Sequence, residues 1–310
     1  MGTPTTDGPV GLLLVDKPAG ITSHDVVAVV RRAARTRRVG HTGTLDPFAT
    51  GLLVVLLGSG TRLIQYVEGE PKVYLARIRF GAETDTDDVT GTVVREAAAP
   101  NDTAIAEGIA RLTGEIDQVP PAYSAKQVGG RRAYDAAREG APLELAPVRV
   151  VVDEWQLVAR DGNDLTVRIA CGSGTYIRAL ARDLGRFAGS AAHLASLRRE
   201  RSGPFAISDA VSIEALTSGD FGLAPLNAAI PTMPTRVLDA AELIRVGHGN
   251  VIPLVPRSAS DEGSEREARV EGSPSGPGSR VALLDDEQTL IAIAERRGDQ
   301  LQPKLVLRDG

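Results

Sequence analysis

The sequence predicts a fold of mixed helices and strands, divided into a large N-terminal part and a smaller C-terminal part. A chain of 310 residues, 42% of them hydrophobic, is long enough to bury the core of one large domain or of two ordinary ones. Short apolar runs typical of strands are interspersed with segments of helical periodicity. A proline-rich segment at 231–234 then indicates a boundary, which leaves 235–310 as the smaller part.

Strands are predicted where apolar runs are short or alternate with polar residues. Residues 52–57 are a continuous apolar run bounded by glycines, as in a fully buried strand, whereas residues 73–80 alternate apolar and basic side chains. Two further runs flank the turn at 161–163 and predict a hairpin. The predicted strands are 11–15, 52–57, 73–80, 148–158, 165–171, one after residue 204, and the short runs 251–255, 280–284, 289–294 and 304–307.

Helices are predicted where apolar residues recur with the helical period. Thr22 and Asp25 match a capping box at the start of the first of them. The glycine-rich segment 172–175 opens another, but it matches neither the Walker nor the dinucleotide-binding pattern, so it does not indicate a nucleotide cofactor. The predicted helices are 22–34, 61–67, 102–112, 131–138, the one that follows residue 174, and one near Ile213.

Several classes of protein are disfavoured by composition. A lone cysteine, Cys171, allows no intramolecular disulfide and no cysteine-based zinc site, and four scattered histidines lack metal-ligand spacing. The acidic segment 83–88 lacks the spacing of an EF-hand and is expected to be a solvated turn. Because the apolar run at 11–15 is too short for a membrane helix or a signal peptide, we expect a cytoplasmic protein without membrane contact.

The distribution of charge is more informative than the net charge of −5, which by itself does not favour a nucleic-acid partner. Arginine abundance can reflect genomic composition, so clustering matters more. Basic residues gather in three groups: Arg31, Arg32, Arg35, Arg37 and Arg38; Lys126, Arg131 and Arg132; Arg198, Arg199 and Arg201. We expect a basic face on an acidic protein, although the first group also suits the C-terminal end of a helix.

Residues 40–51, GHTGTLDPFATG, predict a shaped loop centred on Asp46. Its glycines permit backbone conformations closed to other residues, and Pro47 biases Asp46 toward an extended conformation. The pattern alone also fits an ordinary Asp-Pro turn. A functional reading therefore depends on the other segments of the chain.

Six segments together, in this order, resemble the TruB family of tRNA pseudouridine synthases. They are GLLLVDKPAG at 11–20, GHTGTLDPFATG at 40–51, Tyr74, YSAK at 123–126, GTYIRALARDLG at 174–185 and HLASLRR at 193–199. The resemblance covers about residues 10–205. It implies an α+β fold: a catalytic domain at 9–232, with helices flanking a largely antiparallel central sheet, then a small, mostly β, PUA-like RNA-binding domain at 235–310. Within the latter, the Ser/Gly/Glu/Arg-rich tract 258–279 predicts a disordered insertion.

The resemblance also implies an activity, the isomerisation of uridine 55 in the T loop of tRNA to pseudouridine. Moving the glycosidic bond from N1 to C5 conserves all atoms, so no cofactor is expected. Asp46 as an anion could add to C1′ of the ribose or remove a proton from C2′, and the sequence does not separate these routes. The target nucleotide must first be flipped out of the folded loop. The expected partner is a tRNA T stem-loop, bound by a monomer.

The family's site residues can be carried over to matching positions. Arg178 matches the arginine that pairs with the catalytic aspartate, and its alternative is a helix-surface arginine. Tyr74 matches the tyrosine that stacks on the flipped uracil and serves in deprotonating C5. The remaining matches are the pocket positions Tyr176 and Leu197, His41, which is associated with the displaced base, and Lys17, which contacts phosphate or supports the loop. For Tyr74, Tyr176 and Leu197 the alternative is a place in the core.

Two other classes of function remain open from the sequence. A non-catalytic tRNA-binding or tRNA-folding protein would use the same basic face without needing Asp46. A carboxylate-based glycoside hydrolase would need a second acid opposite Asp46, and no second carboxylate accompanies the motif.

Overall fold

The computed structural model describes residues 8–67, 69–124, 126–128, 130–139, 141, 143–254 and 278–307. The predicted disordered insertion at 258–279 lies outside these residues, apart from Gly278 and Ser279.

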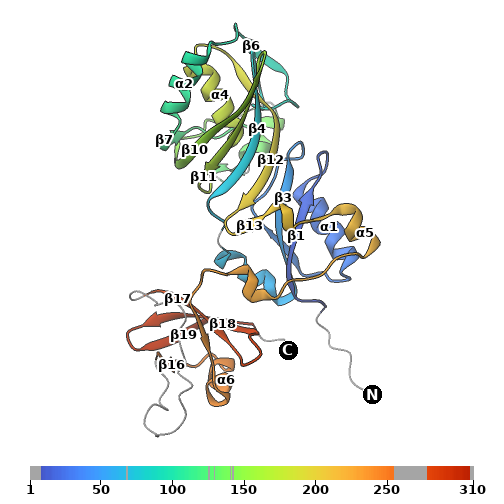
Figure 1. Cartoon of the computed structure of the whole chain (residues 1–310), viewed down its shortest axis with the longest axis vertical. Coiled ribbons are helices and arrows are strands. Elements are labelled where there is room, and N and C mark those ends of the chain that lie inside the picture. The colour runs from blue at the N-terminus through green and yellow to red at the C-terminus, as the bar shows by residue number, and fades with distance from the viewer. Residues whose placement is uncertain are drawn as a thin grey trace.

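A ten-stranded sheet organises the N-terminal part (Figure 1). Its order is β14-β1-β3-β12-β4-β11-β10-β7, with β2 paired to β3 and β13 paired to β12. The pairs β1–β14 and β3–β12 are parallel and the other described pairs are antiparallel, which confirms the largely antiparallel sheet. The strands are β1 Gly11–Lys17, β2 Val39–Thr42, β3 Thr50–Leu57, β4 Lys72–Phe80, β7 Gly114–Gln118, β10 Val148–Asp161, β11 Asp164–Cys171, β12 Ala192–Ser202, β13 Phe205–Ala206 and β14 Val211–Ser212.

The predicted helices occur in the predicted order, two of them with changed type or start, and the short 3₁₀ helices η2 and η3 were not predicted. The capping box at the start of α1 is formed, with the Asp25 backbone N–H donating to the Thr22 hydroxyl at 3.0 Å. The helix predicted at 61–67 is a 3₁₀ helix, η1, and the one predicted from residue 131 starts two residues later, after a short strand. The helices are α1 Ser23–Ala33, η1 Gly58–Tyr66, α2 Asp102–Arg111, α3 Ala133–Arg138, α4 Ile177–Phe187, η2 Ile207–Asp209, α5 Ile213–Ser218 and η3 Leu226–Ala229. In the described part of the chain, none is long and apolar enough to cross a membrane.

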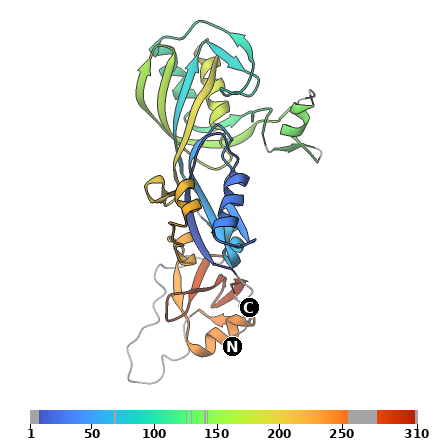
Figure 2. The same cartoon turned by 90° about the vertical axis from the view of Figure 1, so that its right-hand side faces the viewer.

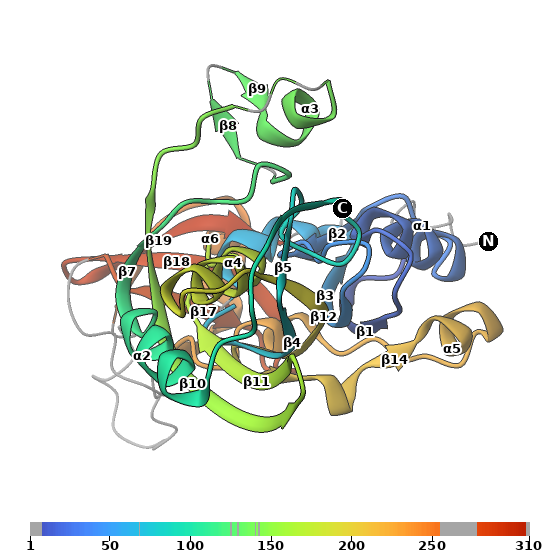
Figure 3. The same cartoon turned by 90° about the horizontal axis from the view of Figure 1, so that it is seen from above.

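Two short hairpins lie outside the main sheet. One is formed by β5 Ala82–Thr84 and β6 Val93–Glu96. The other is formed by β8 Gln127–Val128 and β9 Arg131–Arg132, and together with α3 it projects away from the sheet (Figure 3).

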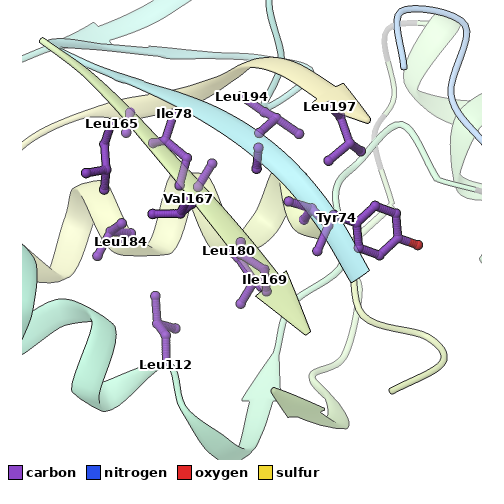
Figure 4. Close-up of a cluster of buried hydrophobic side chains, with 14 of the residues drawn as sticks. Tyr74, Ile78, Leu112, Leu165, Val167, Ile169, Leu180, Leu184, Leu194 and Leu197 are labelled. Carbon is purple, nitrogen blue, oxygen red and sulfur yellow. The ribbon is translucent and has the colours of Figure 1, made fainter. Parts of the chain in front are cut away.

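Helix α4 is held against the sheet by one apolar cluster (Figure 4). Leu180 and Leu184 are completely buried and lie four residues apart, so they share one face of the helix. They belong to the same cluster as Ile78 of β4 and Val167 of β11. Burying a leucine side chain contributes about 2 kcal/mol, so these contacts fix the position of α4 and of the residues at its N-terminus.

A five-stranded sheet of order β15-β17-β18-β19-β16 forms the C-terminal part, at the other end of the molecule from α2 and α4 (Figures 1 and 2). It carries a helix, α6, that was not predicted from the sequence, although Asp239 and Glu242 supply a capping box. The elements are β15 Thr235–Val237, α6 Ala240–Gly247, β16 Ile252–Pro253, β17 Arg280–Leu284, β18 Leu290–Arg297 and β19 Gln300–Val306.

The two parts share an apolar cluster. Leu56 of β3 and Leu63 of η1 belong to the same cluster as Ile293 of β18. Polar contacts accompany it, since the Arg62 Nη1 donates to the Val306 carbonyl at 2.7 Å. The N-terminal and C-terminal parts are therefore joined by both apolar and polar contacts. The domain boundary near 231–234 stays a prediction.

Candidate active site

A cavity of about 620 Å³ lies between β4, β12, the loop after β2 and the N-terminus of α4. Five of the seven residues singled out from the sequence line it: Asp46, Tyr74, Tyr176, Arg178 and Leu197. The other two lie beside it. His41 packs edge-on at 5.7 Å against His24, whose ring lines the cavity, and Lys17 lies behind the Asp46 loop.

The Asp46 loop joins β2 to β3 and is held by close backbone contacts. Gly51 has a φ of +105°, and a Cβ there would lie 2.4 Å from the carbonyl oxygen of Arg199. Only glycine fits such a position without displacing the neighbouring strand. The Ala49 N–H donates to the Asp46 carbonyl at 3.1 Å, which closes a tight turn behind the carboxylate. The conformation of the loop therefore depends on its close contact with the neighbouring strand, which an isolated Asp-Pro turn would not need.

Lys17 supports this loop from behind. Its side chain is completely buried, and its Nζ donates to the carbonyls of Ala49 at 2.7 Å and Pro47 at 3.3 Å, as well as to those of Pro18 and Ile21. Burial lowers the pKa of Lys17 to about 8, and the Asp46 carboxylate opposes the shift. Of the two roles expected for Lys17, the contacts match support of the loop, because its ammonium has no exposed surface for a phosphate.

Asp46 and Arg178 form a two-point ion pair. The Arg178 Nε lies 2.9 Å from the Asp46 Oδ2, and its Nη2 donates to the Oδ1 at 3.1 Å. Arg178 also donates to the carbonyls of Thr86 and Tyr123, so its own position is fixed on two sides. The Arg178 side chain is 6% exposed, whereas that of Asp46 is 36% exposed and stays open to a ligand.

The pKa of Asp46 reflects its burial and the charges around it. Burial raises the pKa of this carboxyl, the Arg178 charge lowers it, and the charge of Asp88 raises it again. The net effect is a raised pKa, so Asp46 loses its negative charge at a higher pH than an exposed aspartate would.

The acidic segment 83–88 is not the solvated turn that we expected. Glu83, Asp87 and Asp88 are buried and face the arginines of α4. Asp88 lies 3.7 Å from Arg178, Asp87 lies 2.8 Å from Arg182, and Glu83 pairs with Arg186. Burial raises the pKa of Asp87 to about 6 even though Arg182 opposes the shift.

A sequence signal for this network exists. The three arginines are spaced four residues apart, which places them on one face of a helix. That spacing could have indicated a matching row of carboxylates, among them Asp88, which contacts Arg178 and was not singled out from the sequence.

Tyr74 closes the cavity from the side of β4. It is 7% exposed and lies at the end of the cluster shared with Leu180, and its hydroxyl points away from the labelled aliphatic side chains (Figure 4). Leu197 of β12 is opposite Ala76 in the neighbouring strand and is also 7% exposed. Each residue therefore belongs both to the core and to the cavity wall. The two alternatives left open by the sequence, a core position and a pocket position, do not exclude each other here.

Tyr176 occupies the N-cap position of α4. Its backbone N–H donates to the Gln118 Oε1 at 2.8 Å, and its carbonyl accepts from the Gln118 Nε2 at 3.1 Å. Its half-buried ring lines the cavity next to Arg178, and burial raises the pKa of its hydroxyl. Gln118 thus anchors the start of the helix that presents both side chains.

The three basic groups are not equivalent. The first group, on α1 and the following turn, is exposed, whereas Arg199 of the third group is 1% exposed and points into the fold. Arg198 pairs with Asp16 at 2.7 Å. The basic residues therefore do not all lie on one exposed face, because Arg198 pairs with Asp16 and Arg199 donates to backbone carbonyls. Within the described residues, no three His, Cys, Asp or Glu side chains cluster in a way that could hold a metal ion.

Comparison with known proteins gives consistent matches along the chain. Residues 31–177 match the family model described as TruB family pseudouridylate synthase (N terminal domain), and residues 178–220 match the tRNA pseudouridylate synthase B C-terminal domain. A protein of Thermobifida fusca named tRNA pseudouridine synthase B is 43% identical over 96% of this chain and 98% of its own length. A protein of the same name from Leifsonia xyli is 44% identical over 94% of each chain.

Solved structures share the fold at low sequence identity. An H/ACA RNP bound to a substrate RNA containing 2′-deoxyuridine includes a chain with a TM-score of 0.70 and 21% identity, covering 99% of this chain and 92% of its own. The archaeal box H/ACA sRNP Nop10-Cbf5 complex gives a TM-score of 0.70 at 23% identity, covering 96% of this chain and 86% of its own.

Proposed function

The chain belongs to the TruB family of pseudouridine synthases, which isomerise uridine in tRNA to pseudouridine, and from this premise we propose that Asp46 performs the reaction on uridine 55 of the T loop. The observation that carries the proposal is the two-point pair of Asp46 with Arg178 in a cavity that also contains Tyr74. In this pair Arg178 opposes the rise in the Asp46 pKa that burial causes, and the carboxylate stays open to a ligand.

The reaction breaks the bond between N1 and C1′, turns the uracil, and forms a bond between C5 and C1′. In one route an oxygen of Asp46 adds to C1′ as the base leaves, and C5 later displaces it. In the other, Asp46 removes a proton from C2′ to give a glycal, and the proton returns when C5 bonds to C1′. Both routes end with loss of the C5 proton and protonation of N1, so atoms and electrons balance without a cofactor.

Arg178 and Tyr74 have separate roles in this proposal. Arg178 orients the carboxylate and opposes its protonation in the buried site. Tyr74 presents a flat ring on which the flipped base stacks, and its hydroxyl removes the proton from C5. Tyr176 and Leu197 complete the apolar walls, and His41, beside His24 at the rim, contacts the displaced base or its neighbours.

Binding of the T stem-loop follows from charge and shape. The exposed arginines at 31–38 lie next to the strand that leads into the Asp46 loop, and such residues contact phosphates without reading sequence. A nucleotide in a folded loop must be flipped out to reach a recessed carboxylate. The five-stranded unit at 235–310 serves as a PUA-like RNA-binding domain, and the enzyme acts as a cytoplasmic monomer.

A non-catalytic tRNA-binding protein is the weaker alternative. Such a protein would not require the Asp46–Arg178 pair, whose buried guanidinium and raised-pKa carboxyl are typical of active sites.

The proposal is tested with a T-arm transcript that carries tritium at C5 of its uridines. Isomerisation releases the tritium to water and leaves the RNA chain intact. A binding protein would retain the label, and a glycoside hydrolase would release free uracil and leave an abasic site. Release of tritium equal to that of one uridine per transcript supports the proposal, and retained label or free uracil contradicts it.

A further inference from the structure

Arg199 is a buried cation without a carboxylate partner among the described residues. Its side chain is held by backbone oxygens: the Nε donates to the Leu52 carbonyl at 2.7 Å and the Nη2 to the Gly43 carbonyl at 3.1 Å. A buried charge is costly unless hydrogen bonds compensate it. Gly43 lies in the Asp46 loop and Leu52 in β3, directly after it, so the guanidinium is anchored to the loop and to the strand that follows.

Arg199 also faces Tyr74. The two residues lie directly opposite each other in the antiparallel pair of β12 and β4. Such partners have their Cβ atoms about 5 Å apart on the same face of the sheet. Both side chains line the cavity. One guanidinium is therefore placed between the Asp46 loop and the tyrosine.

We propose that Arg199 is a positioning residue, which uses its anchor on the Asp46 loop to hold the Tyr74 hydroxyl in place for removal of the C5 proton. The inference rests on the proposed function, in which Tyr74 performs this step. Arg199 acts through Tyr74 and makes no bond to the reacting atoms.

The electrostatics of the site agree with this role. Burial raises the pKa of Tyr74, and both the charge of Arg199 and a hydrogen bond from it lower that pKa. A cation next to the hydroxyl stabilises the anionic form, so a larger fraction of Tyr74 is the phenolate that can accept the C5 proton than burial alone would allow. Two other titratable groups, Cys171 and Asp46, raise the pKa of Tyr74. The charge of Arg199 also lowers the pKa values of Lys72 and His41.

A double-mutant cycle separates this role from a purely structural one. Arg199→Met and Arg199→Lys are each made in the wild-type protein and in Tyr74→Phe, and kcat and KM are measured with C5-tritiated tRNA. We expect Arg199→Met to lower kcat at least about thirtyfold with KM within about threefold, and to lower it less than about threefold when Tyr74 is already Phe. Arg199→Lys keeps the charge, but one ammonium cannot reach the Leu52 carbonyl, the Gly43 carbonyl and the Tyr74 hydroxyl together, so the fall in kcat should be intermediate.

The matched control is Arg168→Met. Arg168 is a strand arginine that pairs with Glu200 at 2.6 Å and does not line the cavity, so its loss should leave kcat unchanged in both backgrounds. Thermal unfolding of each variant reports whether the fold is intact.

Equal losses in the two backgrounds would overturn the inference, because Arg199 would then act without the hydroxyl. Unchanged kcat in Arg199→Met would overturn it as well. If Arg199→Met does not fold, the same cycle with Arg199→Lys decides by the same criterion. A wild-type rate in Tyr74→Phe alone would instead refute the role proposed for Tyr74, an outcome distinct from failure of the coupling.

Discussion

Arg178 reaches Asp46 through two nitrogens, although the residues are 132 positions apart in the sequence. The loop after β2 supplies the carboxylate, and the first turn of α4 supplies the guanidinium. Helix α4 is itself fixed by Leu180 and Leu184 against the sheet. The geometry of the pair therefore depends on the packing of the whole N-terminal core.

Replacement of Arg178 should change the pH dependence of the reaction. In the proposed mechanism Asp46 acts as an anion; burial raises its pKa, and Arg178 lowers it. Arg178→Gln removes the lowering effect, so activity should be lost at a higher pH as the pH falls, with kcat near neutrality reduced about a hundredfold or more. The measurement is kcat against pH under single-turnover conditions. Arg186→Gln, two turns further along α4, should keep the wild-type acid limb, and an unshifted limb in Arg178→Gln would contradict the electrostatic role.

Tyr74→Phe should separate binding from chemistry. The substitution keeps the ring that stacks on the base and removes the hydroxyl, so tRNA affinity should change little while turnover falls at least about a hundredfold. Filter binding and tritium release measure the two quantities. Tyr66→Phe makes the same change at a tyrosine that contacts Arg280 away from the cavity, and should be neutral. An unchanged rate in Tyr74→Phe would leave the tyrosine with a packing role alone.

Gly51→Ala should be among the most damaging single substitutions in the loop. Its Cβ would meet the carbonyl oxygen and the nitrogen of Arg199 at 2.4 and 2.7 Å, and its φ of +105° is strained for alanine. We expect a loss of at least about 3 kcal/mol in the free energy of unfolding, or insoluble protein. Gly219→Ala, with a φ of +82° and no atom within 4 Å, isolates the backbone strain and should cost only about 1 kcal/mol. Denaturant unfolding compares the two, and similar losses would contradict the steric argument.

Truncation near Pro234 tests the C-terminal unit. If 235–310 contacts tRNA away from the T loop, the truncated enzyme should show a raised KM and a shallower salt dependence on full-length tRNA, with kcat within about threefold. On an isolated T-arm hairpin, both forms should perform alike. The apolar cluster that joins Leu63 to Ile293 would be opened, so the melting temperature should fall. Equal loss of activity on both substrates would show that the unit supports the catalytic part structurally.

The sequence predicted elements whose signals are local. The capping box of Thr22 and Asp25, the buried strand at 52–57 and the hairpin around 161–163 are all visible within a short window, and the structure has each of them. Strand β12 was not predicted, because Arg199 occupies a buried position that an apolar residue would normally take.

Long-range pairing explains why the buried acidic segment and the contacts of Arg199 were not predicted. Asp87 and Arg182 lie 95 residues apart, and nothing local in the segment 83–88 indicates that its carboxylates are buried against a helix. The Asp46–Arg178 pair was expected from the family resemblance, whereas the pattern around Asp46 alone fits an ordinary turn. The contacts of Arg199 with the Gly43 and Leu52 carbonyls depend on how β12 pairs with β3, and no local pattern in either segment indicates that long-range pairing.

Turnover by Asp46→Asn is the most direct test of the catalytic assignment. The amide keeps the size of the side chain and its place beside Arg178, but it removes the negative charge on which both routes depend. The variant should unfold at a temperature close to that of the wild type and bind tRNA normally, yet release no tritium from C5-labelled uridine 55 above the enzyme-free background. Tritium release within tenfold of the wild-type rate, by a preparation shown by mass spectrometry to retain asparagine, would contradict the assignment of Asp46 as the catalytic residue.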